Sequence, residues 1–314
     1  MRILIVGGHG FIGSHLTTAL LDAGHEVYVY GSRLVEPSKN LDRRAYSMQG
    51  DIRDLSVLKP AVERAKPEVI YHFAAVQGYT ADSTLFMDVN VTGTWKIFQA
   101  IESWKEWRTL KRFILASSES VYLPKSRRIE SDTQKPPSAY GLSKVFQERS
   151  AQYKCDELGI TLVAMRYAIV LGPGQSLQSS ESGILRNWYH ALNQGIPAEI
   201  YGDGTQERGF VHVADATDAN LAALSGEAGS YNVCSTHASV NQVAKIFEEL
   251  TDCQFETLGR DVRPGGEYTL WSESARARKF LGWQPKHSLR DMVADFLHSV
   301  EQQKKSAKNV HAKA

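Results

Sequence analysis

Four polar residues near the middle of the sequence could together perform acid–base chemistry. Tyr140 and Lys144 are four residues apart in a segment that predicts a helix, so their side chains share one helical face. A lysine ammonium beside a phenol lowers the tyrosine pKa and makes a usable acid or base near neutral pH. Ser118 and Glu119 follow a predicted strand at 111–116, and open parallel sheets bind ligands outside the carboxyl ends of their strands. These residues are our catalytic candidates.

A glycine-rich turn at the start of the chain predicts the partner of this chemistry. Gly7, Gly10 and Gly13 join a short apolar strand at 2–6 to an amphipathic helix at 14–21. Glycine allows the tight turn, the approach of backbone to a pyrophosphate and close packing of helix on strand, while the helix N-terminus offers its N–H groups to phosphate. The turn therefore predicts dinucleotide binding.

The end of the second predicted strand, at 26–30, bears on the choice of dinucleotide. An acidic residue usually holds the adenosine ribose hydroxyls here, but this chain has Gly31, Ser32 and Arg33. A guanidinium binds a 2′-phosphate through a bidentate fork, so we expect NADP rather than NAD. The alternative is that Arg33 is a solvated loop residue.

Further apolar segments predict an α/β fold with a doubly wound parallel sheet. Asp51 could accept a hydrogen bond from an adenine amino group or cap the helix that starts at Leu55. We expect His72 to be a core histidine with hydrogen-bond partners and not a catalytic residue. For Asn90, the alternative to a functional role is a hydrogen bond within the protein interior. The remaining expected strands are 46–50, 68–75, 111–116, 161–167 and 211–213.

Composition excludes several classes of protein. The 314 residues carry a net charge of +1 without a long basic block before the tail, so neither nucleic acid nor a membrane surface is an expected partner. The three scattered cysteines have no metal-ligand spacing, so we expect no metal site and a reducing cytoplasm. The polar, lysine-rich end at 302–314 predicts a disordered tail.

The motifs together resemble those of the extended short-chain dehydrogenase/reductases, in the nucleotide-sugar epimerase/dehydratase group. The matching motifs run nearly end to end: Gly7-x-x-Gly10-x-x-Gly13, Asp51-Ile52-x-Asp54, His72-Phe73-Ala74-Ala75, Asn90-Val91-x-Gly93-Thr94, Ser117-Ser118-x-x-Val121-Tyr122, Tyr140-Gly141-x-Ser143-Lys144, Gly202-Asp203-Gly204-x-Gln206-x-Arg208, Arg263-Pro264-Gly265 and Leu281-Gly282-Trp283-x-Pro285. The resemblance implies a Rossmann domain at 1–170, to which the chain returns at about 211–235. A smaller, discontinuous substrate domain would comprise 171–210 and 236–301.

The resemblance also implies roles for individual residues. Arg208 and Arg263 would contact the substrate diphosphate, for which two guanidinium groups are well suited; the alternative is two surface salt bridges. Ser118 would hydrogen-bond the reacting oxygen. The implied cofactor contacts are Gly7, Gly10, Phe11, Ile12, Gly13, Ser32, Arg33, Asp51, Ile52, Phe73, Ala74, Ala75, Asn90, Tyr140, Lys144 and Tyr167.

Several positions depart from the family pattern. Ile169 stands where relatives carry an asparagine, and Gly174 stands where they carry an arginine, so two polar contacts to the substrate are missing. Gly209 replaces the acidic residue usual after Arg208, and Gly31 replaces the acidic residue of the second strand.

Among the family's reactions, the sequence favours epimerisation of a nucleotide-diphosphate sugar. Tyr140 would take a proton from a sugar hydroxyl while the nicotinamide takes hydride from the same carbon, and a 4-keto intermediate would receive hydride on its other face. The runner-up is an NADPH-dependent 4-ketoreductase, which Ser32 and Arg33 suit. A 4,6-dehydratase is less favoured because Glu119-Ser120 supplies one displaced carboxylate. A dinucleotide-binding protein without activity is disfavoured by the intact catalytic residues.

Two helices predict a homodimer. The segments 85–107 and 139–156 resemble those that pair across a two-fold axis in family dimers. Both carry more large apolar residues than one buried face needs, among them Trp95, Phe98, Trp104 and Phe146. Core packing could account for some of these residues.

Overall fold

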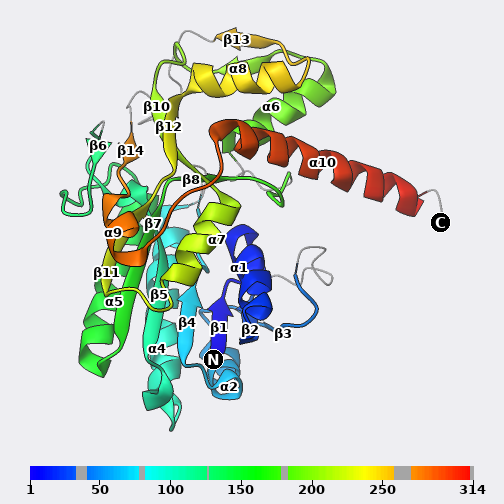
Figure 1. Cartoon of the computed structure of the whole chain (residues 1–314). Helices are drawn as coiled ribbons and strands as arrows, with labels where there is room; N and C mark the ends of the chain where they lie inside the picture. Colours follow the sequence, from blue (N-terminus) through cyan, green and yellow to red (C-terminus); the bar gives the residue numbers. More distant parts are fainter. Residues whose placement is uncertain (33–40, 78–81, 126, 178–182, 258–269, 312–314) are drawn as a thin grey trace.

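The computed structural model of the chain describes residues 1–32, 41–77, 82–125, 127–177, 183–257 and 270–311. Its centre is a seven-stranded parallel sheet with the order β11-β7-β5-β4-β1-β2-β3 (Figure 1). This is the doubly wound α/β architecture that the sequence predicted. Its strands are β1 (Arg2–Val6), β2 (Glu26–Gly31), β3 (Tyr46–Gln49), β4 (Val69–His72), β5 (Arg112–Ser118), β7 (Thr161–Tyr167) and β11 (Gly229–Val233).

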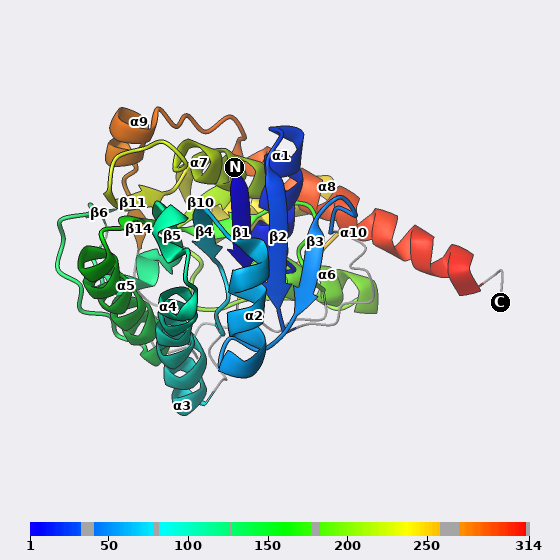
Figure 2. The ribbon, with the colours of Figure 1, turned by 90° about the horizontal axis from the view of Figure 1, so that it is seen from below.

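Helices cover both faces of this sheet because its central strands are apolar on both sides. Leu4 and Val6 of β1 pack with α2, α4 and α5, whereas Ile3 and Ile5 pack with α1 and α7. Figure 2 shows these two groups of helices on opposite faces of the sheet. The helices and short turns of this half are α1 (Phe11–Asp22), α2 (Leu55–Ala65), α3 (Ser83–Leu85), η1 (Phe86–Thr92), α4 (Gly93–Ser103), η2 (Trp107–Thr109), η3 (Glu119–Val121), α5 (Ala139–Leu158), α7 (Val213–Ala222) and α9 (Ala275–Leu281).

The second half of the chain builds a separate apolar core above the sheet. This core includes Trp188, Phe210, Phe247 and Phe296. We propose that it marks the substrate domain at 171–210 and 236–301. Its elements are β8 (Ile169–Leu171), α6 (Gly183–Gln194), β9 (Ala198–Ile200), β10 (Glu207–His212), β12 (Thr236–Ser239), α8 (Val240–Leu250), β13 (Phe255–Thr257) and α10 (Leu289–His311), while β6 (Arg127–Arg128) pairs with β14 (Trp271–Ser272) at its edge.

Two expectations about this half were wrong. Residues 211–212 do not return the chain to the large sheet: they end β10, which pairs with β8 and β12 in a three-stranded sheet. The return is made by α7 and β11 instead. The expected disordered tail also differs, because α10 continues through residues 302–311. Its inner face, with Met292, Phe296 and Val300, is buried, and a docked helix extends readily once it has begun.

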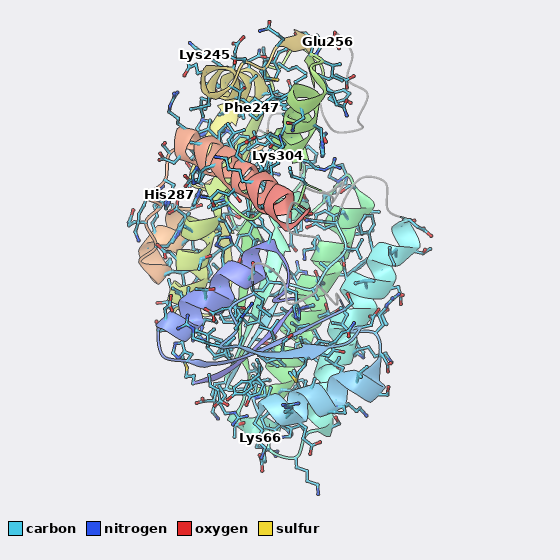
Figure 3. The ribbon with its side chains drawn as sticks, turned by 90° about the vertical axis from the view of Figure 1, so that its right-hand side faces the viewer. Lys66, Lys245, Phe247, Glu256, His287 and Lys304 are labelled. Atoms are coloured by element: carbon cyan, nitrogen blue, oxygen red, sulfur yellow. The ribbon has the colours of Figure 1, made fainter. Side chains whose placement is uncertain are left out.

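The two halves of the chain lie toward opposite ends of the molecule (Figure 1). In Figure 3, Phe247 and Glu256 lie at one end of the molecule and Lys66 lies at the other, with α10 crossing between them. Among the helices that the structure describes, none combines the length and the apolar composition needed to cross a bilayer.

Helix α5 is held against the sheet by buried polar contacts as well as by Ala151 and Cys155 of the apolar core. Glu148 accepts hydrogen bonds from Arg166 of β7, with Nε at 2.9 Å and Nη2 at 2.7 Å, and from Gln134 Nε2 at 2.7 Å. Ser117 of β5 donates to the same carboxylate. Because Glu148 and Arg166 are both buried, this ion pair fixes α5 relative to β5 and β7.

This ion pair gives a prediction for stability. Glu148→Gln leaves the Arg166 charge buried without its partner, so we expect the free energy of unfolding to fall by about 3–5 kcal/mol. Denaturant titration measures the change. Glu249→Gln is the control because it removes an exposed carboxylate from Arg290, and it should cost no more than about 1 kcal/mol. Equal costs in the two variants would contradict the structural role of Glu148.

Candidate active site

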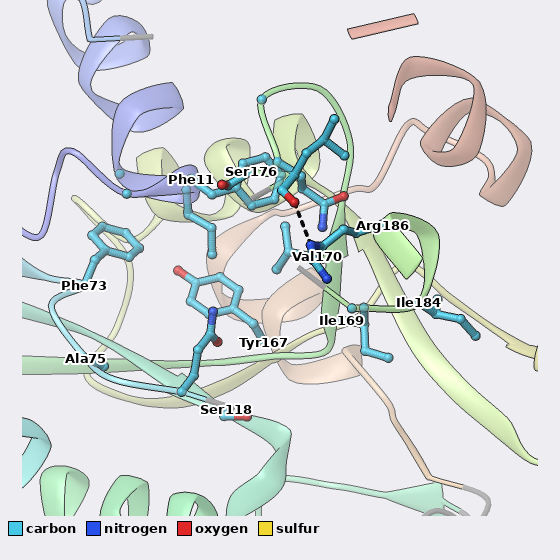
Figure 4. Close-up of a pocket in the computed structure, with 18 of the residues that line it drawn as sticks. Phe11, Phe73, Ala75, Ser118, Tyr167, Ile169, Val170, Ser176, Ile184 and Arg186 are labelled. Carbon is cyan, nitrogen blue, oxygen red and sulfur yellow. Dashed lines mark hydrogen bonds between the residues drawn. The ribbon is translucent and has the colours of Figure 1, made fainter. Parts of the chain in front are cut away.

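A cavity of about 3050 Å³ opens between the carboxyl ends of the parallel strands and the second half of the chain (Figure 4). It is lined by most of the residues that the sequence singled out. Those from the predicted cofactor and catalytic sets are Gly7, Gly10, Phe11, Ile12, Gly13, Ser32, Asp51, Ile52, Phe73, Ala74, Ala75, Ser118, Glu119, Tyr140, Lys144 and Tyr167. Residues far apart in the chain therefore meet in one space.

The turn after β1 has the geometry of a dinucleotide cradle. Gly7 has a φ of +89°, and a Cβ there would lie 2.4 Å from the backbone nitrogen of Ala74. At Gly13 a Cβ would lie 2.7 Å from the carbonyl oxygen of Gly7. The residue before α1 is Gly10, which has no side chain to cap the helix. The N–H groups of the first turn of α1 therefore remain available to a phosphate, and the residues present fit a dinucleotide.

His9 explains how the second strand ends without an acid. A Cβ on Gly31 would lie only 3.0 Å from His9 Nδ1, so the imidazole occupies the space of a side chain at position 31. His9 Nε2 is held 2.9 Å from Ser47 Oγ, and burial lowers the pKa of His9. His9 was not among the site residues predicted from the sequence. Its position between Gly7 and Gly10, within the glycine-rich turn, is the signal that could have identified it.

The structure distinguishes the two roles that the sequence left open for Asp51, which are adenine binding and capping of the next helix. Asp54, not Asp51, caps α2 by accepting a hydrogen bond from Ser56 N at 2.8 Å. The hydrogen bonds that Arg53 donates to Asp51 lower the pKa of that carboxyl group, and the carboxylate lies at the cavity wall. Adenine recognition by Asp51 stays a prediction.

Asn90 does not reach the cavity, against its place among the implied cofactor contacts. Its side chain is buried and bonds both backbone groups of Val76, at 2.7 and 2.9 Å, and Ser143 Oγ at 2.9 Å. Internal hydrogen bonding therefore describes Asn90 better than a cofactor contact does, because its polar side-chain atoms already have protein partners. His72 is buried in the core as expected, but it is only partly satisfied: Nε2 lies 2.8 Å from Thr94 Oγ1, whereas Nδ1 has no hydrogen-bond partner among the described residues. Burial together with the charge of Lys144 lowers its pKa to about 3.

The catalytic candidates converge at the carboxyl end of β5. Tyr140 and Lys144 lie on one face of α5 and line the cavity. Ser118, the last residue of β5, lines the same cavity. Lys144 Nζ donates to the carbonyl of Ala116 at 2.7 Å and to Gln147 Oε1 at 2.7 Å, which leaves the third ammonium hydrogen for a ligand. Burial lowers the pKa of Lys144 to about 7. The arrangement can move a proton between Tyr140 and a bound hydroxyl group.

Glu119 borders the cavity but has structural partners. Its Oε2 lies 2.9 Å from Arg128 Nη2 and accepts a hydrogen bond from Ser272 Oγ at 3.0 Å. Burial raises its pKa to about 7. A Cβ on Gly209 would lie 3.4 Å from Glu119 Oε2 and 2.8 Å from Cys234 Sγ. Glu119 thus stands beside the position where the family's acidic residue is absent, and its catalytic role stays a prediction.

The second half contributes the rest of the wall. Tyr167 lies at the end of β7 and donates to Asn220 Oδ1 at 2.8 Å, and Arg208 of β10 reaches the same cavity. Ile169 also faces it, so this part of the wall is apolar (Figure 4). Arg33 and Arg263 lie outside the described residues.

Comparison with known proteins identifies the family. Residues 3–234 match the model of the NAD dependent epimerase/dehydratase family. The chain belongs to this family. The resemblance seen in the sequence is thereby confirmed, and the match extends over most of the chain.

Individual relatives match nearly the whole chain. A UDP-glucose 4-epimerase from Lacticaseibacillus casei is 29% identical, covering 94% of this chain and 95% of the relative. The structure of a UDP-glucose 4-epimerase from Thermotoga maritima with UDP-glucose has a TM-score of 0.87 and 27% identity, and covers 96% and 99% of the two chains. A UDP-glucuronic acid 4-epimerase from Bacillus cereus, in complex with UDP-glucuronic acid and NAD, has a TM-score of 0.85, with 26% identity and coverage of 96% and 100%.

The buried ammonium of Lys144 gives a pH-dependent prediction. Its pKa in the folded protein is about 7, against 10.5 for an ordinary lysine. The buried charge therefore destabilises the fold below pH 7, and this cost declines as the pH rises from about 7 toward 10.5. Lys144→Met removes this dependence. We expect the melting temperature of the variant, relative to the unchanged protein, to be highest near pH 6 and to fall toward pH 9.

Lys154 of the same helix is the matched control. Burial lowers the pKa of Lys154, but the carboxylates of Glu102 and Glu157 more than offset this effect and the pKa is raised. The difference in melting temperature for Lys154→Met should therefore stay flat between pH 6 and 9. Calorimetry of the dinucleotide-free protein measures both variants, and a flat profile for Lys144→Met as well would refute the titration of Lys144.

Proposed function

We propose that this protein is an NAD-dependent nucleotide-sugar epimerase that inverts carbon 4 of a UDP-hexose. The observation that carries the proposal is the meeting of Ser118, Tyr140 and Lys144 beside the Gly7 turn, in one cavity that also takes in Arg208. Relatives that match nearly end to end are UDP-glucose 4-epimerases, which supports the uridine nucleotide.

NAD is the proposed cofactor. Neighbours with the same fold are complexes with NAD, and the preference for NADP that the sequence suggested has no support from them. Arg33, on which that preference depended, lies outside the described residues. When bound, NAD would accept a hydride from carbon 4 and return it.

The residues of this chain supply the remaining steps. Tyr140 would accept the proton of the sugar 4-hydroxyl as hydride leaves the same carbon, and would return it after the 4-keto sugar has turned. Lys144 would favour the phenolate of Tyr140 by its charge. Ser118 would hydrogen-bond the reacting oxygen; its Oγ accepts a bond from Ser120 N at 3.1 Å, which leaves the hydroxyl hydrogen for that oxygen.

The other reactions of the family have weaker support. A 4,6-dehydratase needs a further acid and base, but Glu119 is held by Arg128 and Ser272. The 4-ketoreductase depended on a 2′-phosphate contact from Arg33. Neither gains an observation from the described structure.

Conversion of substrate tests the proposal directly. We expect NMR of the purified protein with UDP-glucose, without added cofactor, to show formation of UDP-galactose. Tyr140→Phe should lower turnover by at least about a hundredfold and leave NAD affinity unchanged, because the phenol moves a proton and is not needed to hold the dinucleotide. Near-normal turnover in this variant would remove Tyr140 from the mechanism. No conversion of any UDP-hexose by the unchanged protein would sink the proposal.

We also propose that two copies pair through α4 and α5. Phe98 and Trp104 are buried in the core, so they do not belong to the pairing surface. Trp95 and Phe146 are exposed, as are Leu142 and Tyr153 of α5. Exposed apolar side chains gathered on neighbouring helices favour a self-association surface.

A charge on this surface tests the dimer. We expect Phe146→Glu to shift the sedimentation coefficient from that of a dimer to that of a monomer, because a carboxylate is costly to bury in an apolar interface. Val57→Glu on α2 is the control, since Val57 and Phe146 are each 40% exposed. A monomer before substitution, or an intact dimer after it, would exclude pairing through this surface.

A further inference from the structure

Arg186 lies where the second half of the chain needs a polar contact. The sequence shows that Ile169 and Gly174 replace the asparagine and arginine of the family pattern. In the structure both positions line the cavity, one with an apolar side chain and one with backbone alone. These two positions therefore offer no polar side chain to a diphosphate, and a contact that replaces theirs would come from another element.

The first turn of α6 supplies a candidate. Arg186 lines the same cavity, and Figure 4 shows its side chain within the pocket, in the region of Ile169, Val170 and Ser176. It does not belong to any motif that the sequence analysis used. The helix that carries it begins at Gly183, and Gly183 and Ile184 line the same cavity.

The contacts of Arg186 orient its guanidinium without neutralising it. Nε donates to the carbonyl of Leu177 at 2.7 Å, and Nη1 donates to Asn187 Oδ1 at 3.1 Å. Both partners are uncharged oxygens, and among the described residues no carboxylate forms an ion pair with Arg186. Within that part of the chain, Nη2 keeps both of its hydrogens for a ligand. A positioned guanidinium of this kind in a cavity is suited to bind phosphate oxygens.

We propose that Arg186 binds the diphosphate of the substrate, in place of the polar groups that Ile169 and Gly174 do not supply. The inference rests on the proposed function, because it takes the ligand to be a nucleoside diphosphate sugar. Arg208 reaches the cavity from β10, so the diphosphate would lie between two guanidinium groups carried by different elements. Arg186 thus becomes a determinant of substrate affinity and not of hydride transfer.

Calorimetric titration of the NAD-loaded protein with UDP tests this role. We expect Arg186→Ala to weaken UDP binding about ten- to a hundredfold, the reduction typical of removing a charge-assisted hydrogen bond, and to leave uridine binding unchanged. Raised salt should weaken UDP binding less in the variant than in the unchanged protein. Arg290→Ala is the control, because Arg290 forms an exposed ion pair with Glu249 outside the cavity.

A second substitution separates removal of a phosphate ligand from damage to the fold. Ile169→Asn restores an amide donor to the wall, so in the Arg186→Ala background it should recover UDP affinity about two- to tenfold. UDP affinity that stays within twofold in Arg186→Ala would overturn the inference, as would a decrease in NAD affinity in place of UDP affinity. Failure of the unchanged protein to bind UDP would instead overturn the proposed function.

Discussion

The polar attachment of α5 to the sheet is the constraint on which the site depends. The buried face of this helix carries Lys144, Gln147 and Glu148, where most surface helices present an apolar stripe. Glu148 holds Arg166 of β7, while Lys144 donates to the carbonyl of Ala116 in β5. Apolar contacts are non-directional and would tolerate small shifts of the helix. Hydrogen bonds between buried groups do not, because a displaced partner would leave a costly unpaired charge. The helix that carries Tyr140 and Lys144, the proposed catalytic residues, is therefore fixed in register with the strand that carries Ser118.

Two of the departures from the family pattern have a spatial explanation. A Cβ at Gly31 would lie 3.0 Å from His9 Nδ1, so the imidazole would have to shift to admit an acidic side chain. A Cβ at Gly209 would lie 2.8 Å from Cys234 Sγ and 3.4 Å from the carboxylate of Glu119. In both places a side chain from a different part of the chain crowds the position where the family pattern has a carboxylate. In the same way, we propose that Arg186 replaces the polar groups that are missing at positions 169 and 174. The side chains on this wall of the cavity then differ from those of the family pattern.

The second half of the chain closes the cavity through its own core and not through the large sheet. Strand β10 carries Arg208 and pairs with β8 and β12, so the arginine is positioned by a small sheet of this half. The sequence placed Arg208 in this half but wrongly assigned residues 211–213, which include the end of the same strand, to the large sheet. Helix α10 also takes part, since Gln302, Gln303 and Lys304 line the cavity although their composition suggested a disordered tail. Packing of the preceding turns on the apolar core of this half supplies the stability that composition alone did not indicate.

The sequence by itself determined the parallel sheet, the dinucleotide turn and the Ser118, Tyr140 and Lys144 set. These features depend on local rules: alternation or runs of apolar residues, glycine at positions of close approach and spacing along one helix. Only the tertiary structure decided the contacts between distant segments. It gave Asn90 partners within the protein interior, placed His9 beside Gly31 and brought Arg186 into the wall of the cavity, because each outcome depends on which side chain occupies a shared volume. Spacing along a chain does not encode that volume; it is set when the separate cores pack against one another.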